Sequence, residues 1–194
     1  MPQKALPSVT AIIVAAGASR RMGFDKLSYR LPDGRTVLET SCALFAAHPA
    51  VDELVLVAGG NRPQCEAIAA ACPKPCTVVQ GGATRADSVR SGLAAAKGQL
   101  VAIHDAARPF ASAEIIAAAL QAAAESGAAA PAVPVKDTIK IADQDGKVVA
   151  TPDRAMLYAV QTPQCFDRAL YLQALETVSG EKASLVTDDC SLFE

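Results

Sequence analysis

Short apolar runs alternate with longer alanine-rich or amphipathic segments along most of the chain. The runs have the length and branched-residue content of buried strands, and they occupy residues 9–16, 53–58, 77–79, 100–103 and 129–135. Segments with helical signals follow them. This βαβα order predicts an α/β, Rossmann-like fold, in which helices cover both faces of a mostly parallel, twisted sheet.

Helix boundaries are marked by capping residues. Thr36 and Glu39 have the spacing of a capping box, which predicts a helix that runs to about His48. The same kinds of signal predict further helices after Asn61, over residues 87–97, between Ser112 and Gly127, and from about residue 167.

The pattern changes in the second half of the chain. Residues 137–141 and 147–151 have the composition of the two strands of an exposed hairpin, and the sheet pattern resumes at 158–162. We therefore expect one domain over residues 1–194, from which a β-arm projects at about 135–156. Exposed hairpins of this kind often contact a partner subunit.

Charge and composition exclude several classes of protein. A formal net charge of −2 over 194 residues argues against a nucleic-acid-binding protein, which needs a basic surface. No apolar run is long enough to span a bilayer, so a membrane protein is not expected. The six cysteines include no C-x-x-C pair, which favours buried free thiols in a cytoplasmic protein over a zinc site or disulfides.

The first apolar run opens into a loop that combines small residues with cations. Residues 15–18 let the backbone approach a ligand closely, and Arg20, Arg21 and Lys26 follow. Backbone N–H groups, guanidinium forks and an ammonium together suit a polyphosphate. The P-loop and G-x-G-x-x-G patterns are absent, which favours a nucleotidyltransferase over a dinucleotide-dependent oxidoreductase. The alternative is an ordinary strand-to-helix turn with solvated basic residues.

A second glycine loop precedes the helix expected at 87–97. Gly81 and Gly82 allow close backbone approach, and Arg85 and Ser88 place donors near a helix start. Because ligands bind beyond the carboxyl ends of the strands in such sheets, we expect this loop to lie beside the first. The alternative is a capped helix after a glycine turn.

A charged loop follows the strand expected at 100–103. Asp105 could hold Mg²⁺ or a sugar hydroxyl, and Arg108 could hold an anion. The alternative is a structural Asp–Arg pair. His104 is expected to be a packed histidine rather than a nucleophile.

Seven segments occur in the order in which one enzyme family carries them: AAGASRRM with Lys26, GGATRADSVRSGL, HDAARP, VKDTIK, DRAML, QTPQ and TDD. Over nearly its whole length the chain thereby resembles the 2-C-methyl-D-erythritol 4-phosphate cytidylyltransferases of non-mevalonate isoprenoid biosynthesis. The resemblance implies transfer of a cytidylyl group from CTP to a sugar-alcohol phosphate, with Mg²⁺ present and pyrophosphate released. It also implies a homodimer, because in the family the arm crosses to a second subunit.

The resemblance assigns roles by position. It implies that the catalytic residues are Arg21, Lys26 and Arg154. With Arg85 added from its place at a helix start, the expected CTP-binding residues are Ala15, Ala16, Gly17, Ala18, Arg20, Gly82, Arg85 and Ser88. The expected acceptor-binding residues are Asp105, Arg108, Thr138, Thr162 and Thr187, and Asp105 is also the expected Mg²⁺ ligand. Thr138 and Arg154 would complete the site of the neighbouring subunit.

The chain departs from the family pattern at several points. Val14 stands where the family usually has proline, Ser19 where it has a second loop glycine, and Ala83 where an acidic residue is common. The family's N-I-K segment, whose lysine helps to position the acceptor phosphate, has no counterpart in the 194 residues. A ribitol 5-phosphate cytidylyltransferase, a non-catalytic nucleotide-binding homologue and one half of a bifunctional enzyme remain alternatives.

Overall fold

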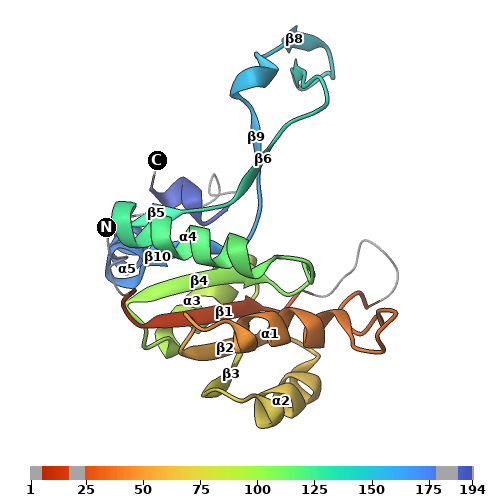
Figure 1. The fold of residues 1–194 in the computed structure, drawn as a ribbon. Helices are drawn as coiled ribbons and strands as arrows, with labels where there is room; N and C mark the ends of the chain where they lie inside the picture. The colour runs from red at the N-terminus through yellow and green to blue at the C-terminus, as the bar shows by residue number, and fades with distance from the viewer. Residues whose placement is uncertain (1–5, 18–24, 178–187, 194) are drawn as a thin grey trace.

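A computed structural model describes residues 6–17, 25–177 and 188–193 of the chain. Its centre is a six-stranded sheet with the strand order β3-β2-β1-β4-β10-β5 (Figure 1). The strands are β1 (Val9–Val14), β2 (Glu53–Ala58), β3 (Cys76–Gln80), β4 (Leu100–Asp105), β5 (Ala128–Ala129) and β10 (Gln164–Asp167). Strands β1 to β4 pair in parallel, whereas β10 is antiparallel to both of its neighbours. The predicted α/β class with a mostly parallel sheet is confirmed.

The described residues also include five α-helices and two short 3-10 helices. They are α1 (Val37–Ala47), α2 (Arg62–Ala71), α3 (Arg85–Ala95), α4 (Ala113–Ser126), α5 (Arg168–Thr177), η1 (Arg154–Met156) and η3 (Cys190–Leu192).

The predicted helix caps at α1 and α4 are confirmed. Thr36 and Glu39 form a reciprocal capping box, with the Glu39 N–H donating to Thr36 Oγ1 at 3.1 Å. Ser112 caps α4, and Gly127 ends it in the left-handed region at a φ of 88°. These local contacts satisfy backbone groups that a helix end leaves unpaired, which is why the sequence predicts them well.

The start of α3 differs from the prediction. The helix begins at Arg85, before the expected residue 87, because Thr84 and Asp87 form a second capping box. The Asp87 N–H donates to Thr84 Oγ1 at 3.1 Å, and the Thr84 N–H donates to Asp87 Oδ2 at 3.2 Å. The box places Arg85 on the first turn, where its side chain reaches the edge of the sheet.

Alternate side chains of the strands build a core on each face of the sheet. Ile13 and Leu56 pack with α1, α2 and α4 on one face, and Ile12 and Val57 pack with α3 and α5 on the other. This two-sided burial follows from the period-two geometry of a strand. It explains why the sequence of β1 and β2 is almost continuously apolar.

Two segments that were predicted to be strands of the central sheet pair differently in the structure. The segment 129–135 divides into β5, which belongs to the sheet, and β6 (Ala132–Pro134), which pairs outside it with β9 (Tyr158–Val160). The strand expected at 158–162 therefore lies outside the sheet, and β10 takes its place between β4 and β5. Val133 is 51% exposed and Tyr158 is 59% exposed, so apolar composition alone does not mark a core strand here.

Residues 131–161 form a projecting segment, which we call the arm (Figure 1). Its two strands start together at the sheet, where the Gln161 N–H donates to the Pro131 carbonyl oxygen at 2.8 Å. A hairpin of β7 (Ile141–Ala142) and β8 (Val148–Ala150) lies at its far end, so the hairpin strand expected at 137–141 pairs only from Ile141 onward. The strand pairing of the arm begins before and ends after the predicted range 135–156.

Within the described part of the chain, the helices are too short or too polar to cross a membrane.

Candidate active site

The loops that follow β1 and β2 are tied together at the carboxyl ends of these strands. Asn61 Nδ2 donates to the Ala15 carbonyl oxygen at 3.2 Å, and Asn61 Oδ1 accepts from the Gly59 N–H at 2.9 Å. The Asn61 side chain therefore joins the two loops and makes no capping hydrogen bond to α2, although the residue occupies the N-cap position. The predicted site residues Ala15 and Ala16 lie at this junction, and Gly17 follows them in the chain.

The turn after β3 packs directly on the first loop. A Cβ atom on Gly81 would lie 2.4 Å from Ala16 Cβ and 2.9 Å from Ser88 Oγ, so glycine is required for this approach. Ser88 is buried, and its Oγ donates to the Thr84 carbonyl oxygen at 2.9 Å and accepts from the Gly82 N–H at 3.2 Å. The structure thus brings together Ala16, Gly82 and Ser88, and the Ser88 hydroxyl shapes the loop.

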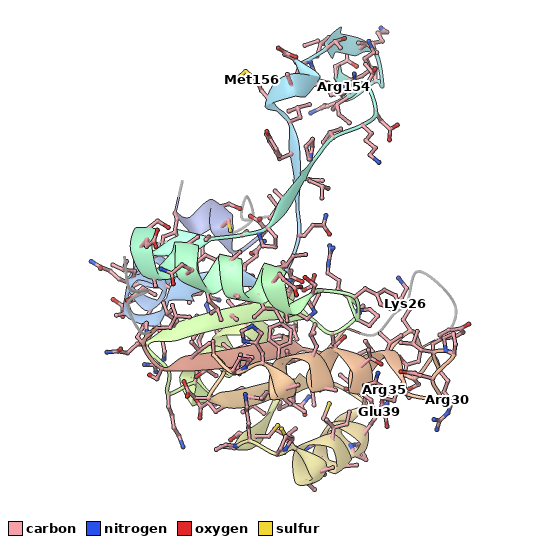
Figure 2. The ribbon with its side chains drawn as sticks, viewed as in Figure 1. Lys26, Arg30, Arg35, Glu39, Arg154 and Met156 are labelled. Carbon is pink, nitrogen blue, oxygen red and sulfur yellow. The ribbon has the colours of Figure 1, made fainter. Side chains whose placement is uncertain are left out.

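Lys26 lies on a turn that the core holds in place. Its neighbour Leu27 is buried, and the Leu27 carbonyl oxygen accepts from the Leu38 N–H of α1 at 3.2 Å. Figure 2 shows Lys26 beyond the ends of β1 and β4. The predicted residues that lie outside the described part of the chain are Ala18, Arg20, Arg21 and Thr187.

The loop after β4 carries the charged residues of the site. Asp105 Oδ1 lies 3.3 Å from Arg85 Nε, and Asp105 Oδ2 lies 3.4 Å from Arg108 Nε. Arg108 also donates to the side-chain oxygen of Gln161 at the base of the arm. The predicted pair Asp105 and Arg108 is therefore part of a larger charged group that includes Arg85, and the carboxylate of Asp105 lies between two guanidinium groups.

The buried side chain of His104 holds the backbone of this loop. Its Nε2 lies 3.0 Å from the Arg108 carbonyl oxygen, and because a carbonyl only accepts, we assign the proton to Nε2. The other ring nitrogen, Nδ1, then accepts from Thr162 Oγ1 at 3.0 Å. Burial lowers the pKa of His104 to about 4, against a partial opposing effect of its hydrogen bond to Arg108. His104 is packed in the core, as the sequence predicts, and its lowered pKa keeps it neutral at pH 7.

Thr162, expected to bind the acceptor, is buried beneath the same loop. Its Oγ1 also accepts from the Asp105 N–H at 3.4 Å, so the hydroxyl connects His104 with the backbone of Asp105. In this arrangement Thr162 holds the loop that carries the acidic side chain.

Tyr171 and Asp189 belong to this site but were not among the predicted site residues. Arg85 Nη1 donates to Asp189 Oδ2 at 2.7 Å, and Tyr171 Oη donates to Asp189 Oδ1 at 2.7 Å. Burial alone would lower the pKa of Arg85, but Asp189 and Asp105 outweigh it and raise that pKa. The motif T-D-D contains Asp189, but nothing local to the sequence indicates its pairing with Tyr171 and Arg85.

The arm residues expected in the site lie elsewhere in this chain. Thr138 is exposed, and Arg154 lies in η1, where its Nη1 donates to the Lys136 carbonyl oxygen at 2.7 Å. Figure 2 shows Arg154 on the arm, well separated from Lys26. Within a single chain the arm therefore does not bring Thr138 and Arg154 to the loops at the sheet edge.

The described residues offer a metal ion few ligands of their own. They contain no group of three or more His, Cys, Asp or Glu side chains placed to hold a metal. Asp105 offers an accessible carboxylate at the sheet edge, with a side chain that is 34% exposed. One carboxylate fits Mg²⁺ that is bound mainly through substrate phosphates, as is common for this ion.

The six cysteines all lie in the described part of the chain, and none of them forms a disulfide. Burial raises the pKa of Cys65 to about 11 and that of Cys76 to about 12, and it raises the pKa of Cys42 and Cys165 as well. These four thiols are poor nucleophiles at neutral pH, because the thiolate is the reactive form.

A comparison with known families identifies the arrangement. Residues 9–194 match the model of the family described as 2-C-methyl-D-erythritol 4-phosphate cytidylyltransferase. The chain belongs to this family. Its members are nucleotidyltransferases of isoprenoid biosynthesis, and the match favours them over the ribitol 5-phosphate enzymes and the oxidoreductases that the sequence left as alternatives.

Individual relatives agree with the family match. The chain is 46% identical, over 96% of its length and 79% of the relative, to a 2-C-methyl-D-erythritol 4-phosphate cytidylyltransferase of Symbiobacterium thermophilum. It is 44% identical to a bifunctional enzyme IspD/IspF of Anaeromyxobacter dehalogenans, and it covers 49% of that longer protein. The crystal structure of a 4-diphosphocytidyl-2C-methyl-D-erythritol synthase from Anaerococcus prevotii is similar with a TM-score of 0.83 and 34% identity, covering 96% of this chain and 81% of that one.

Proposed function

We propose that this chain transfers the cytidylyl group of CTP to 2-C-methyl-D-erythritol 4-phosphate, which yields 4-diphosphocytidyl-2-C-methyl-D-erythritol and pyrophosphate. The family match over residues 9–194 supports the substrates. The observation that carries the proposal is the convergence of separate loops at one sheet edge, where Ala16 packs on Gly81 and Ser88, and Asp105 lies between Arg85 and Arg108. Such an edge is where parallel α/β sheets bind ligands.

The reaction needs little acid–base chemistry from the protein. A phosphomonoester has a second pKa of about 6, so its oxygen is already a nucleophile at neutral pH and can attack the α-phosphorus of CTP. The bond from that phosphorus to the bridging oxygen of pyrophosphate breaks as the new bond forms. This agrees with a site whose histidine is buried and neutral.

The protein then contributes position and charge. In the proposal, Ala15, Ala16 and Gly17 let the backbone approach the triphosphate, and Arg21 and Lys26 stabilise the charge that develops at the reacting phosphorus and leaving group. Bound Mg²⁺ would neutralise phosphate charge, with Asp105 as the residue that holds it.

The acceptor site is proposed to need a second subunit. The arm exposes apolar side chains, among them Val149 at 62% and Met156 at 79% exposure. Figure 2 shows Met156 on the arm. A two-stranded segment buries little core of its own, and a two-fold dimer would cover both arms reciprocally. Thr138 and Arg154 would then serve the acceptor site of the partner.

Two broader assignments complete the proposal. We class the sheet as Rossmann-like, because β3, β2, β1 and β4 are parallel neighbours in that order and the ligand loops lie at their carboxyl ends. We place the protein in the cytoplasm, because six cysteines without a disulfide are typical of a reducing compartment.

Pyrophosphate release tests the reaction. The purified protein is incubated with CTP and Mg²⁺, and the acceptor is either 2-C-methyl-D-erythritol 4-phosphate or ribitol 5-phosphate. We expect release with the first acceptor and little with the second. Release with ribitol 5-phosphate alone would reassign the acceptor, and CTP binding without release on either acceptor would make the chain a non-catalytic homologue.

Mixing two inactive variants tests the shared site. Lys26→Ala damages the loop at the sheet edge, and Arg154→Ala damages the arm. A mixed dimer holds one site with both defects and one with neither, so up to about a quarter of wild-type activity should return if half of the dimers are mixed. If Arg154 serves its own subunit, every site carries one defect. Dimers that have exchanged and stay inactive would then reject the shared site.

A further inference from the structure

We propose that Arg85 is a positioning residue for Asp105: it fixes that carboxylate at the sheet edge and is itself anchored by the buried Asp189. This inference rests on the proposed function and deepens it. It replaces the expectation, drawn from the sequence, that Arg85 binds CTP directly.

The donors of Arg85 that the structure shows engaged both point at carboxylates. Nη1 donates to Asp189 at 2.7 Å, and Nε donates to Asp105 at 3.3 Å. A guanidinium is planar and rigid, so a short bond at one end fixes the direction of the other donors. Arg85 therefore presents its Nε to Asp105 in one orientation, which Asp189 sets.

Asp189 is itself held firmly. Its side chain is 5% exposed, and its two oxygens accept from Arg85 and from Tyr171 Oη. Its backbone N–H donates to Gln164 Oε1 at 3.0 Å, which ties it to β10. A buried carboxylate with these partners has little freedom to move, so it suits the role of an anchor.

At its other end, Arg85 contacts Asp105 and, through it, the charged loop after β4. Asp105 receives Arg85 at one oxygen and Arg108 at the other, and Arg108 continues to Gln161 at the base of the arm. A guanidinium at each oxygen of the Asp105 carboxylate fixes the plane of that carboxylate. An acceptor hydroxyl or a phosphate-bound Mg²⁺ would then meet Asp105 already oriented, which reduces the entropy lost on binding.

Steady-state kinetics with paired substitutions test the role. Arg85→Lys keeps the charge but cannot reach both carboxylates as a rigid fork. We expect kcat/KM for 2-C-methyl-D-erythritol 4-phosphate to fall about ten- to hundredfold, the size typical of a lost orienting partner. The dissociation constant for CTP, from calorimetric titration without Mg²⁺, should not change. Arg90→Lys is the matched control, because Arg90 is on the same helix and pairs with Asp87.

A double substitution separates positioning from direct binding. If Arg85 acts through Asp105, adding Arg85→Lys to Asp105→Asn should cost little beyond Asp105→Asn alone. If the effects of the two substitutions on kcat/KM multiply, the proposal is overturned. Weaker CTP binding without Mg²⁺, with an unchanged KM for the acceptor, would also overturn it and would assign Arg85 to nucleotide binding.

Urea unfolding tests the contact between Arg85 and Asp105 without relying on activity. It compares the wild type, Arg85→Lys, Asp105→Asn and the double variant. Wild-type protein without pyrophosphate release would reject the proposed function, and the unfolding midpoints would still decide the contact. We expect the double variant to lower the unfolding midpoint by less than the sum of the decreases in the two single variants. Additive midpoints would show that Arg85 does not hold Asp105.

Discussion

His104 gives the stability of this protein a specific dependence on pH. The side chain is fully buried, and its ring lies tilted against that of Phe45 with ring centroids 4.8 Å apart. Its neutral form satisfies the Arg108 carbonyl oxygen and the Thr162 hydroxyl together. Protonation of Nδ1 would place a charge in the core and turn the acceptor for Thr162 into a donor. Acid should therefore unfold the protein partly through this residue.

The magnitude follows from the pKa. The unfolded chain binds a proton at His104 below 6.5, whereas the folded chain does not bind it until the pKa of about 4. Stability is therefore complete above 6.5 and is lost as the pH falls through this window, by about 3 kcal/mol in total. Between about pH 7.5 and pH 5 the loss is about 2 kcal/mol by the same linkage relation.

Urea unfolding of wild-type protein and of His104→Gln measures this loss. The glutamine amide can still donate to the Arg108 carbonyl oxygen but cannot be protonated in this range. Other titrating groups, including His48, remain in both proteins, so the difference between them isolates His104. With an m-value of about 2–3 kcal/mol/M, the wild-type midpoint should fall by roughly 0.7–1 M more than that of the variant between the two pH values.

Parallel midpoints would refute the reasoning. If both proteins lose the same stability between the two pH values, His104 does not exchange its proton differently in the folded and unfolded states. A variant that loses more stability than the wild type in acid would contradict the neutral Nε2–H tautomer as well.

Two further predictions concern the loops. Lys26→Ala should lower kcat about a hundredfold, the loss of about 3 kcal/mol typical of one transition-state donor, and should change CTP binding and melting temperature little. The control is Lys97→Ala, because Lys97 lies just before the start of β4, at the opposite end of the strands. Near-normal turnover of Lys26→Ala would reject its catalytic role. Gly81→Ala should weaken CTP binding measured by titration, because the added Cβ would lie 2.4 Å from Ala16 Cβ. Gly60→Ala, where a Cβ would meet nothing within 4 Å, should bind CTP normally, and equal affinity of the two variants would contradict the packed junction.

Local signals in the sequence predicted most of the sheet and its helices. Strands β1, β2 and β4 are short apolar runs, and the capping pairs that start α1 and α4 lie within a few residues of each other. The start of α3 was missed by two residues, although the Thr84–Asp87 capping box could have been found from its spacing. Because parallel strands place their carboxyl ends at one edge, the approximate position of the site also followed from the sequence.

The second half of the chain needed the tertiary structure. Residues 129–135 and 158–162 are as apolar as short core strands, yet β6 and β9 pair with each other in the arm while β10 enters the sheet. Which segment joins a sheet depends on competition between distant strands, and a short apolar run contains no information on its partner. The antiparallel strand β10 was therefore not predicted.

The site divides in the same way. The residue types that carry its chemistry, such as the glycines and cations of the loops and Asp105 with Arg108, could be recognised from the sequence because each motif is contiguous. The contacts that orient them join residues far apart in the chain: Arg85 meets Asp189, Asp189 meets Tyr171, and Thr162 meets His104. These pairings depend on how the helices pack on the sheet, so the sequence by itself determined the chemistry available at the sheet edge, and only the tertiary structure decided which side chains hold which.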